Sequence, residues 1–319
     1  MQTITIDNTS DSDQRIDKFL KKYLKNASLG AIYKFLRTGK IKINKKKVEQ
    51  TYRIVLNDEV QFFLTDSELG EMKKETTKKP ILQNTKIDIL YEDRYFLAVN
   101  KPAWMNVHPW DHKSTEASLI ELVQDMLGED YQSLSFRPAL VHRIDRDTTG
   151  LVLIAKEKVA LESLLSDLQN SKIGKIYHTI VVGIPEKRRD TISVPLRRRD
   201  NAQDEAKVIV DLDAGQRAIT HTTLIQSGIS GKYSLLECQI ETGRTHQIRV
   251  HLAHRGTPIL GDKAYGNKKE NSFARGAFSI TRQLLHAHSL ILSHPITREK
   301  MTLIAPYPDD FVRLLEYTE

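Results

Sequence analysis

Two short amphipathic segments near the N-terminus predict a pair of helices. In the first, the apolar side chains Ile16, Phe19, Leu20, Tyr23 and Leu24 recur at the three- and four-residue spacing of one helix face. The second segment starts after Ser28, which is a favourable N-cap residue, and ends at Gly39, which is a favourable C-cap. Its apolar face carries Ile32, Tyr33, Phe35 and Leu36.

Short strands are predicted after these helices. Residues 41–44 alternate between apolar and polar side chains, and residues 55–63 supply a further strand. Residues 66–86 are polar, lack a clear period and mix both charge signs. We therefore predict a first domain over residues 1–65, a linker over 66–86 and a larger domain over 87–319.

The larger domain is predicted to be rich in strands. Helical patterns fall at residues 116–127, 159–169 and 310–316, and they do not alternate strictly with the strands. This order favours an α+β fold with a mixed, mostly antiparallel sheet over a doubly wound parallel sheet. Strand-like segments occupy residues 87–92, 95–101, 150–156, 175–183, 206–212, 233–241, 246–254 and 284–294.

Composition narrows the class of protein. The chain has 319 residues, of which 39% are hydrophobic, and no uninterrupted apolar run reaches the 18 residues that a membrane span needs. The first 15 residues are polar and show no secretory signal. The one cysteine, Cys238, excludes an internal disulfide and a multi-cysteine zinc site, and we expect it to be an inert strand residue. A cytoplasmic protein is expected.

Positive charge is concentrated in the first domain. Residues 1–65 hold 13 basic and 7 acidic side chains, and residues 18–47 hold 11 basic side chains and no acidic one. Such a density favours a polyanion such as RNA as partner, although a merely solvated basic face is the alternative. The candidate RNA-binding side chains in this cluster are Lys34, Arg37, Lys40, Lys42 and Lys45.

A polar loop in the larger domain is the main candidate for chemistry. The sequence HRIDRDTTG, residues 142–150, feeds directly into the apolar strand LVLIAK. Its carboxylates, Asp145 and Asp147, are able to act as nucleophile, base or metal ligand, while turn formation and surface ion pairs are the alternative. A glycosidase pair is discounted, because side chains two residues apart do not dependably converge.

The histidines do not predict a metal centre. If residues 246–254 form a strand, His246 and His251 point to opposite faces, and no cysteine or neighbouring acid completes a set with His254. His286 and His288 share one face of a predicted strand, which leaves a metal there as an open alternative. We expect no metal and no cofactor.

Two parts of the chain resemble known families. Residues 14–62, with RIDKFL, IYKFLRTGKIKIN and LNDEV, resemble the αL RNA-binding domain of the S4 type. The loop HRIDRDTTG is similar to the HRLDxxTSG signature of the RluA family of pseudouridine synthases. Four further segments resemble that family in the same order, although Trp104 replaces a usual glycine: residues 89–109, 174–183, 241–266 and 284–295.

The resemblance covers residues 87–318 and is nearest to the RluC-type branch, which carries the same appended domain. It implies isomerisation of uridine to pseudouridine in RNA, without a cofactor. It also implies that Asp145 is the attacking carboxylate, that Arg249 is its basic partner and that Tyr177 stacks on the uracil and transfers a proton at C5. Arg143 matches a residue that enters the RNA stack vacated by the flipped nucleotide.

Other roles remain open for several of these residues. Arg143 has an alternative as an ion-pair partner of Asp147, and Tyr177 as a filler of the strand. Arg244 and His246 are second-tier candidates that either orient the backbone or bind phosphate.

Three functions are compatible with the sequence. The appended basic domain favours large-subunit ribosomal RNA as substrate, whereas the same chemistry on tRNA and a non-catalytic RNA-binding or ribosome-assembly factor are the alternatives. A monomer without a membrane or an obligatory protein partner is expected.

Overall fold

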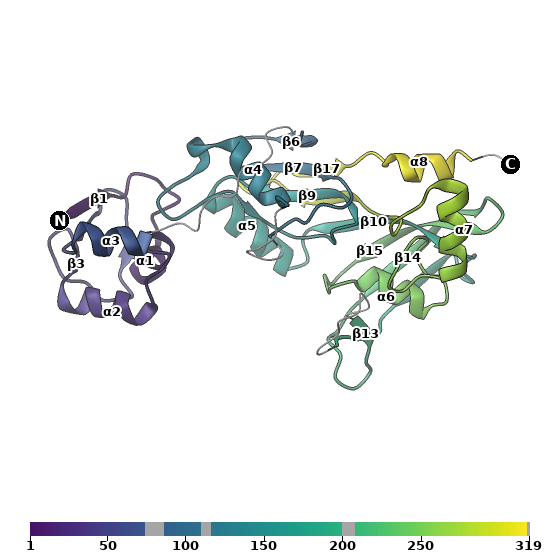
Figure 1. Ribbon diagram of the computed structural model, residues 1–319, viewed down its shortest axis with the longest axis horizontal. Helices are drawn as coiled ribbons and strands as arrows, with labels where there is room; N and C mark the ends of the chain where they lie inside the picture. Colours follow the sequence, from purple (N-terminus) through teal and green to yellow (C-terminus); the bar gives the residue numbers. More distant parts are fainter. Residues whose placement is uncertain (74–85, 110–115, 200–207, 318–319) are drawn as a thin grey trace.

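The computed structural model describes residues 1–73, 86–109, 116–199 and 208–317 (Figure 1). The first domain, at the purple end of the chain, contains both predicted helices. They are α1 (Ile16–Tyr23) and α2 (Leu29–Thr38). Ser28 caps α2 by accepting a hydrogen bond from the Ala31 amide, and Gly39 ends it with a φ of 77°, so both predicted caps are confirmed.

The helices of the first domain pack on small antiparallel sheets. One has the strand order β1-β5-β3, and β2 pairs with β4. One shared hydrophobic core includes Phe19, Leu36 and Phe62, all of which are buried. The strands are β1 (Gln2–Thr5), β2 (Gln14–Arg15), β3 (Ile41–Ile43), β4 (Arg53–Ile54) and β5 (Glu59–Phe62).

The start of the predicted linker is helical instead. Helix α3 spans Asp66–Lys73, and its Leu69 and Met72 pack against the core of the first domain. The helix is polar apart from these few contacts, so its pattern is too weak to distinguish it from a linker. Residues 74–85 of the predicted linker lie outside the described residues.

The larger domain is built on one ten-stranded sheet, with the order β11-β14-β15-β10-β16-β9-β7-β6 and with β17 and β8 attached to β16 and β9 (Figure 1). Among the described residues, β9 and β16 form its parallel pair and the other pairs are antiparallel, which confirms the predicted mixed sheet. A separate small pair is formed by β12 (Leu196–Arg198) and β13 (Val208–Val210). The strands of the large sheet are β6 (Ile89–Glu92), β7 (Phe96–Lys101), β8 (Ala139–Leu140), β9 (Thr149–Ala155), β10 (Gly174–Val182), β11 (Arg189–Ile192), β14 (Thr220–Ile229), β15 (Tyr233–Ile240), β16 (Leu285–Ser293) and β17 (Lys300–Ile304).

Three helices of this domain lie close to their predicted positions: α4 (Leu119–Leu127), α5 (Lys158–Gln169) and α8 (Asp309–Leu315). A 3₁₀ turn, η1, spans Glu129–Tyr131, and α7 (Lys268–Phe278) was not predicted.

The predicted strand over residues 246–254 is wrong. This segment is helix α6, Gln247–His254. Its residues 247–252 are all buried, so the helix has no long polar face to reveal a 3.6-residue period. The alternation of Ile248, Val250 and Leu252 therefore imitates a strand.

A buried carboxylate joins the two domains. Asp11 is fully buried, and its oxygens accept hydrogen bonds from the Leu134 and Ser135 amides and from the hydroxyls of Ser133 and Ser135, at 2.6–2.9 Å. Leu134 also packs against the core of the first domain. The loop after η1 thus holds the first domain against the larger domain.

Candidate active site

The candidate loop lies between β8 and β9 and is fixed at its end by the sheet. Thr149 and Gly150 pair in parallel with His286 and Ala287 of β16. Gly150 has a φ of 106°, and a Cβ atom there would clash with the Ala287 carbonyl oxygen, so glycine is required. The Thr149 hydroxyl lies 2.9 Å from His286 Nδ1. Thr149 and Gly150, the last two residues of the motif, therefore fix the C-terminal end of the loop on the sheet.

Asp145 and Arg249, which are 104 residues apart in the sequence, form an ion pair at the centre of the site. Arg249 Nη1 donates to Asp145 Oδ2 at 3.0 Å. The Asp145 side chain is 28% exposed, whereas that of Arg249 is 9% exposed. The carboxylate is thus accessible from the pocket while its partner lies beneath it.

Arg249 is held from behind by Asp262. Its Nε and Nη2 donate to the two Asp262 oxygens at 2.7 and 3.0 Å, and Asp262 also accepts from the amides of Ala264 and Tyr265. Burial opposes the charge of Arg249, but the hydrogen bonds and charges of Asp262 and Asp145 outweigh it, so the pKa of Arg249 is raised. The guanidinium stays charged in a buried place.

Tyr265 and His246 complete this side of the site. The Arg249 guanidinium lies 5.2 Å from the centre of the Tyr265 ring, and His246 Nδ1 lies 3.0 Å from the Tyr265 hydroxyl. His246 Nε2 is 3.8 Å from Asp145 Oδ2. His246 has a φ of 55° and stands as the N-cap of α6. The predicted residue His246 is therefore beside the carboxylate.

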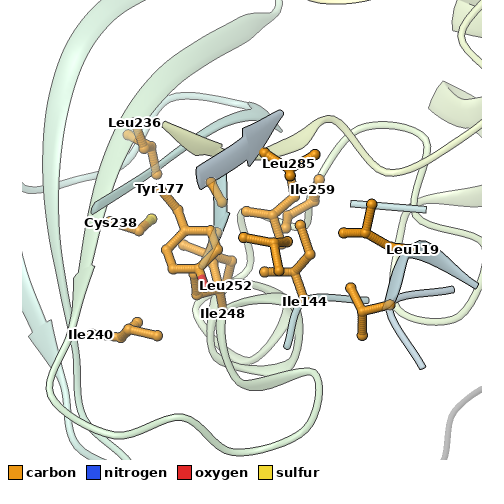
Figure 2. Close-up of a cluster of buried hydrophobic side chains, with 14 of the residues drawn as sticks. Leu119, Ile144, Tyr177, Leu236, Cys238, Ile240, Ile248, Leu252, Ile259 and Leu285 are labelled. Atoms are coloured by element: carbon orange, nitrogen blue, oxygen red, sulfur yellow. The ribbon is translucent and has the colours of Figure 1, made fainter. Parts of the chain in front are cut away.

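Tyr177 reaches the site from β10. Figure 2 shows its ring among apolar side chains that include Ile144, Ile248 and Leu252. The residue is 9% exposed. Burial, with a smaller contribution from the negative charge of Asp145, raises the pKa of the Tyr177 hydroxyl, which is therefore protonated at neutral pH.

These side chains surround one pocket, which is lined by both apolar and polar residues. Asp145, Tyr177 and Arg249, predicted from three distant motifs, all line it, as do Arg143, Arg244 and His246. The remaining lining residues are Ile144, Thr148, Ile240, Gly243, Gln247, Ile248 and Leu285. The fold brings every predicted site residue of the larger domain to one place.

The two predicted arginines on the rim differ from Arg249 in being exposed. Arg244 Nε donates to the Arg217 carbonyl at 3.2 Å. The carboxylate of Asp147 lies 4.0 Å from the guanidinium of Arg146, and within the described ranges it forms no ion pair with Arg143. Burial raises the pKa of Asp147, against the neighbouring positive charges.

Two buried cations, not predicted from the sequence, hold the candidate loop. Lys101 Nζ donates to the carbonyls of Pro102, Met105 and Arg146 at 2.7–2.9 Å. Burial, together with the positive charge of Arg282, lowers the pKa of Lys101 to about 7.

The second cation, Arg282, donates to the Asp147 carbonyl and pairs with Asp310. Of these two cations, only Lys101 lies in a segment that resembles the family, residues 89–109, and nothing in the sequence marks it as part of the site. Asp262 also lies in a segment that resembles the family, residues 241–266, but no spacing in the sequence marks it as a partner of Arg249.

The predicted RNA-binding side chains of the first domain lie on α2, on β3 and in the segments around β3. Lys34, Arg37, Lys40 and Lys45 are exposed and Lys42 is half-buried. Lys42 lies over the ring of Phe63, which is itself exposed, at 5.0 Å. This group is a basic surface with an aromatic side chain.

The other histidines make structural contacts. His251 is buried on α6, with Nδ1 2.9 Å from the Thr220 hydroxyl and Nε2 3.0 Å from the Val194 carbonyl. The ring of His288 stacks on that of His178 at 4.0 Å. Over the described ranges, no group of three histidine, cysteine or acidic side chains is placed to hold a metal ion. No helix in those ranges has the length and apolarity to span a membrane.

Comparisons with known proteins show the family of the chain. Residues 95–254 match the RNA pseudouridylate synthase family, and residues 14–60 match the S4 domain. The ribosomal large subunit pseudouridine synthase C of Buchnera aphidicola subsp. Baizongia pistaciae (strain Bp) is 37% identical over 95% of this chain and 93% of its own. An uncharacterized RNA pseudouridine synthase of Bacillus subtilis (strain 168) is 34% identical over 98% and 97%.

The fold has a solved counterpart as well. The human RNA pseudouridylate synthase domain containing 4 protein superposes with a TM-score of 0.56 and 25% identity, over 72% of this chain and 91% of its own. The family match spans β7 to α6 and includes every pocket-lining residue except Leu285, and the relatives extend over nearly the whole chain. The chain therefore belongs to the RNA pseudouridylate synthase family, a family of isomerases, and carries an S4 RNA-binding domain at its N-terminus.

Proposed function

We propose that this protein converts uridines of large-subunit ribosomal RNA to pseudouridine, with Asp145 as nucleophile. The observation that carries the proposal is the ion pair between Asp145 and Arg249 in a pocket that also contains the Tyr177 ring. The relatives whose names specify ribosomal large subunit support this RNA as the substrate. The protein acts in the cytoplasm as a monomer, without an obligatory protein partner.

The reaction needs a carboxylate that remains ionised inside a pocket closed by a base. Arg249 supplies the compensating positive charge at 3.0 Å, which opposes the desolvation of Asp145 when the uridine enters. The N1–C1′ bond breaks, the uracil turns, and a C5–C1′ bond forms. The C5 proton leaves and N1 gains a proton, so the reaction is balanced without redox chemistry.

Tyr177 provides the face for the flipped base. Its ring lines the pocket, and its protonated hydroxyl is a donor that does not compete with Asp145 as a nucleophile. Proton transfer at C5 is the role that we assign to it: the hydroxyl gives its proton to N1 of the uracil and takes the C5 proton in return, so Tyr177 ends protonated as it began. A uridine in a folded RNA reaches this pocket only after it leaves the base stack, and exposed Arg143 on the rim fills the vacated position.

Arg244 and His246 have supporting roles at the rim. Both line the pocket, and exposed Arg244 is placed to bind a phosphate of the RNA. On the S4 domain, Lys34, Arg37, Lys40, Lys42 and Lys45 contact phosphates without base readout.

The test compares wild type with Asp145→Asn, which keeps the size of the side chain and removes its charge. Unmodified large-subunit rRNA and tRNA transcripts are incubated with each protein, and pseudouridine is located by chemical mapping. We expect modification of the rRNA by wild type alone, with RNA affinity of the variant within several-fold. Modification of tRNA only reassigns the substrate, and absence of modification by wild type favours a non-catalytic RNA-binding protein.

A further inference from the structure

Trp104 is an exposed aromatic residue in an unusual backbone conformation. It lies in the loop after β7, its residue exposure is 40%, and its φ is 66°. The left-handed region is unfavourable for a bulky side chain and is normally occupied by glycine. Neither the pairing of strands nor the core explains why this position carries an indole.

The loop that presents Trp104 is fixed relative to the candidate nucleophile. Lys101 Nζ donates to carbonyls on both sides of Trp104, at Pro102 and Met105. The same ammonium donates to the carbonyl of Arg146, the residue after Asp145. The indole is thus held at a set position with respect to the candidate loop.

Two cations lie against the indole. Lys263 Nζ is 5.3 Å from the ring centre and the Arg146 guanidinium is 5.9 Å from it. Each cation directly follows a carboxylate of the central ion-pair network, Asp262 or Asp145. Both cations are exposed, and the Arg146 guanidinium also lies 4.0 Å from the carboxylates of Glu116 and Asp147.

An exposed aromatic face beside two positive charges matches the two parts of a nucleotide. A base stacks on an indole regardless of its sequence, and phosphates bind to lysine and arginine. A hydrophobic protein segment fits this place less well, because it offers no charge to Lys263 and Arg146. The position next to the candidate nucleophile selects the part of the RNA that lies close to the reacting uridine.

We propose that Trp104, Arg146 and Lys263 form a binding site for a nucleotide that neighbours the target uridine in the RNA. Its base stacks on the indole, and its phosphates are neutralised by the two cations. The inference rests on the proposed function, since it takes RNA as the substrate. Trp104 then contributes affinity and helps to select the uridine that enters the pocket.

The first test measures RNA affinity and single-turnover rate with an unmodified large-subunit rRNA transcript. Trp104→Gly removes the ring at a φ that suits glycine, so we expect stability to be maintained and the RNA concentration for half-maximal rate to rise about 5- to 150-fold. Trp104→Phe keeps an aromatic face and should recover most of the loss. The control is Phe273→Ala, because Phe273 is also exposed, on α7, with Lys232 over its ring.

The second test follows the indole directly by fluorescence. The chain has two tryptophans, so Trp110→Phe leaves Trp104 as the only one. Its emission should be quenched as the rRNA transcript is added. A control with tryptophan placed only at position 273, in a W104F/W110F/F273W chain, should show little change. This arm remains decisive if Trp104→Gly does not fold.

The third test concerns the two cations. Lys263→Gln and Arg146→Gln should each lower the salt dependence of binding, by about 0.7–0.9 in the log–log slope. Lys300→Gln, on an exposed position of β17, is the control.

The outcomes separate this inference from the proposed function. Equal affinity of Trp104→Gly and wild type, or unquenched Trp104 in the RNA complex, overturns the nucleotide site even when wild type forms pseudouridine. Absence of pseudouridine with wild type, by contrast, contradicts the proposed function. In that case quenching and the affinity loss still measure whether Trp104 binds RNA.

Discussion

The Asp262 carboxylate accepts two hydrogen bonds from Arg249, and this contact orients the third nitrogen of the guanidinium towards Asp145. Asp262 is 1% exposed and is not among the residues that line the pocket. It is a positioning residue. A lysine at position 249 has a single charged atom, which is unable to hold both carboxylates in this two-sided geometry.

Replacing Arg249 should therefore affect stability as well as activity. Arg249→Met leaves Asp262 buried without a counter-charge, and loss of one partner of a buried pair costs about 3–5 kcal/mol. We expect the free energy of unfolding in urea to fall by this amount. Arg244→Met, which removes an exposed guanidinium, is the control and should change it by about 0.5 kcal/mol or less. Equal effects of the two variants would show that Asp262 does not depend on Arg249.

Tyr177→Phe should separate chemistry from folding. The variant keeps the ring in its apolar surroundings (Figure 2) and removes only the hydroxyl, so the stability change should stay within about 1.5 kcal/mol. Single-turnover formation of pseudouridine should be lost while RNA binding remains. Because the pKa of Tyr177 is raised, wild-type activity should show no decline from its ionisation up to about pH 10.

The matched control for this experiment is Tyr233→Phe. Tyr233 is fully buried on β15, and its hydroxyl donates to Glu270 rather than facing the pocket. Full activity of the Tyr233 variant and of the Tyr177 variant alike would contradict the role of the Tyr177 hydroxyl in proton transfer.

Acid should destabilise the protein partly through His286. Burial, with smaller effects of nearby positive groups, lowers the pKa of His286 to about 3 despite its hydrogen bond to the Ala305 carbonyl. Below about pH 6.5 His286 binds a proton in the unfolded chain, whereas in the folded protein it stays neutral until about pH 3. This contribution to stability is complete above pH 6.5 and is lost as the pH falls, by about 1.36 kcal/mol per pH unit.

His286→Gln removes this titration, so urea unfolding between pH 6 and 4 should depend less steeply on pH, by about one proton. His221→Gln is the control, because His221 is exposed at 40% of its side chain. An unchanged slope for the His286 variant would mean that His286 titrates equally in both states.

The domain contact predicts a specific effect of Asp11. Asp11→Ala leaves four donors of residues 133–135 without their acceptor, so the S4 domain should separate from the larger domain while both remain folded. Small-angle scattering should show an increased radius of gyration. Asp13→Ala is the control, since Asp13 is 84% exposed and pairs with Arg53. An unchanged scattering curve for the Asp11 variant would show that the remaining contacts, such as the packing of Leu134 and the hydrogen bond from Lys158 Nζ to the Ser12 carbonyl, hold the domains together without it.

The basic surface of the S4 domain should appear in the salt dependence of RNA binding. Combined replacement of Lys34, Arg37 and Lys45 by glutamine removes up to three phosphate contacts, so the log–log slope should decrease by about 2–3. The matched control replaces Lys268, Lys269 and Lys300, which are exposed in the larger domain. The same slope for both triple variants would indicate a solvated face rather than an RNA contact.

Sequence patterns were most informative where one local feature determined the structure. The caps Ser28 and Gly39 predicted the ends of α2, and the apolar runs predicted β9 and β10. Helix α6 failed because a helix that is buried on most sides has no contrast between faces, so periodicity does not distinguish it from a strand.

The pocket shows a second limit on what the sequence alone predicts. Motif order gave Asp145, Tyr177 and Arg249, and the structure places all three in one pocket. Asp262 and Lys101 escaped prediction because their importance comes from tertiary contacts: a carboxylate behind Arg249 and an ammonium among three carbonyls. Neither contact follows a helix or strand period, since Asp262 lies 13 residues after Arg249, and Lys101 reaches Arg146 across 45 residues as well as the nearby carbonyls of Pro102 and Met105.

The parallel contact between β9 and β16 also imposes an order on the synthesis of the protein. The Thr149 hydroxyl meets His286 across 137 positions of sequence, and Gly150 lies against Ala287. The S4 domain, by contrast, draws its core from early residues, with Leu134 as the late addition. A chain growing on the ribosome therefore displays its RNA-binding surface long before the end of the loop with Asp145 is anchored. For that interval, we expect the nascent protein to associate with RNA without modifying it.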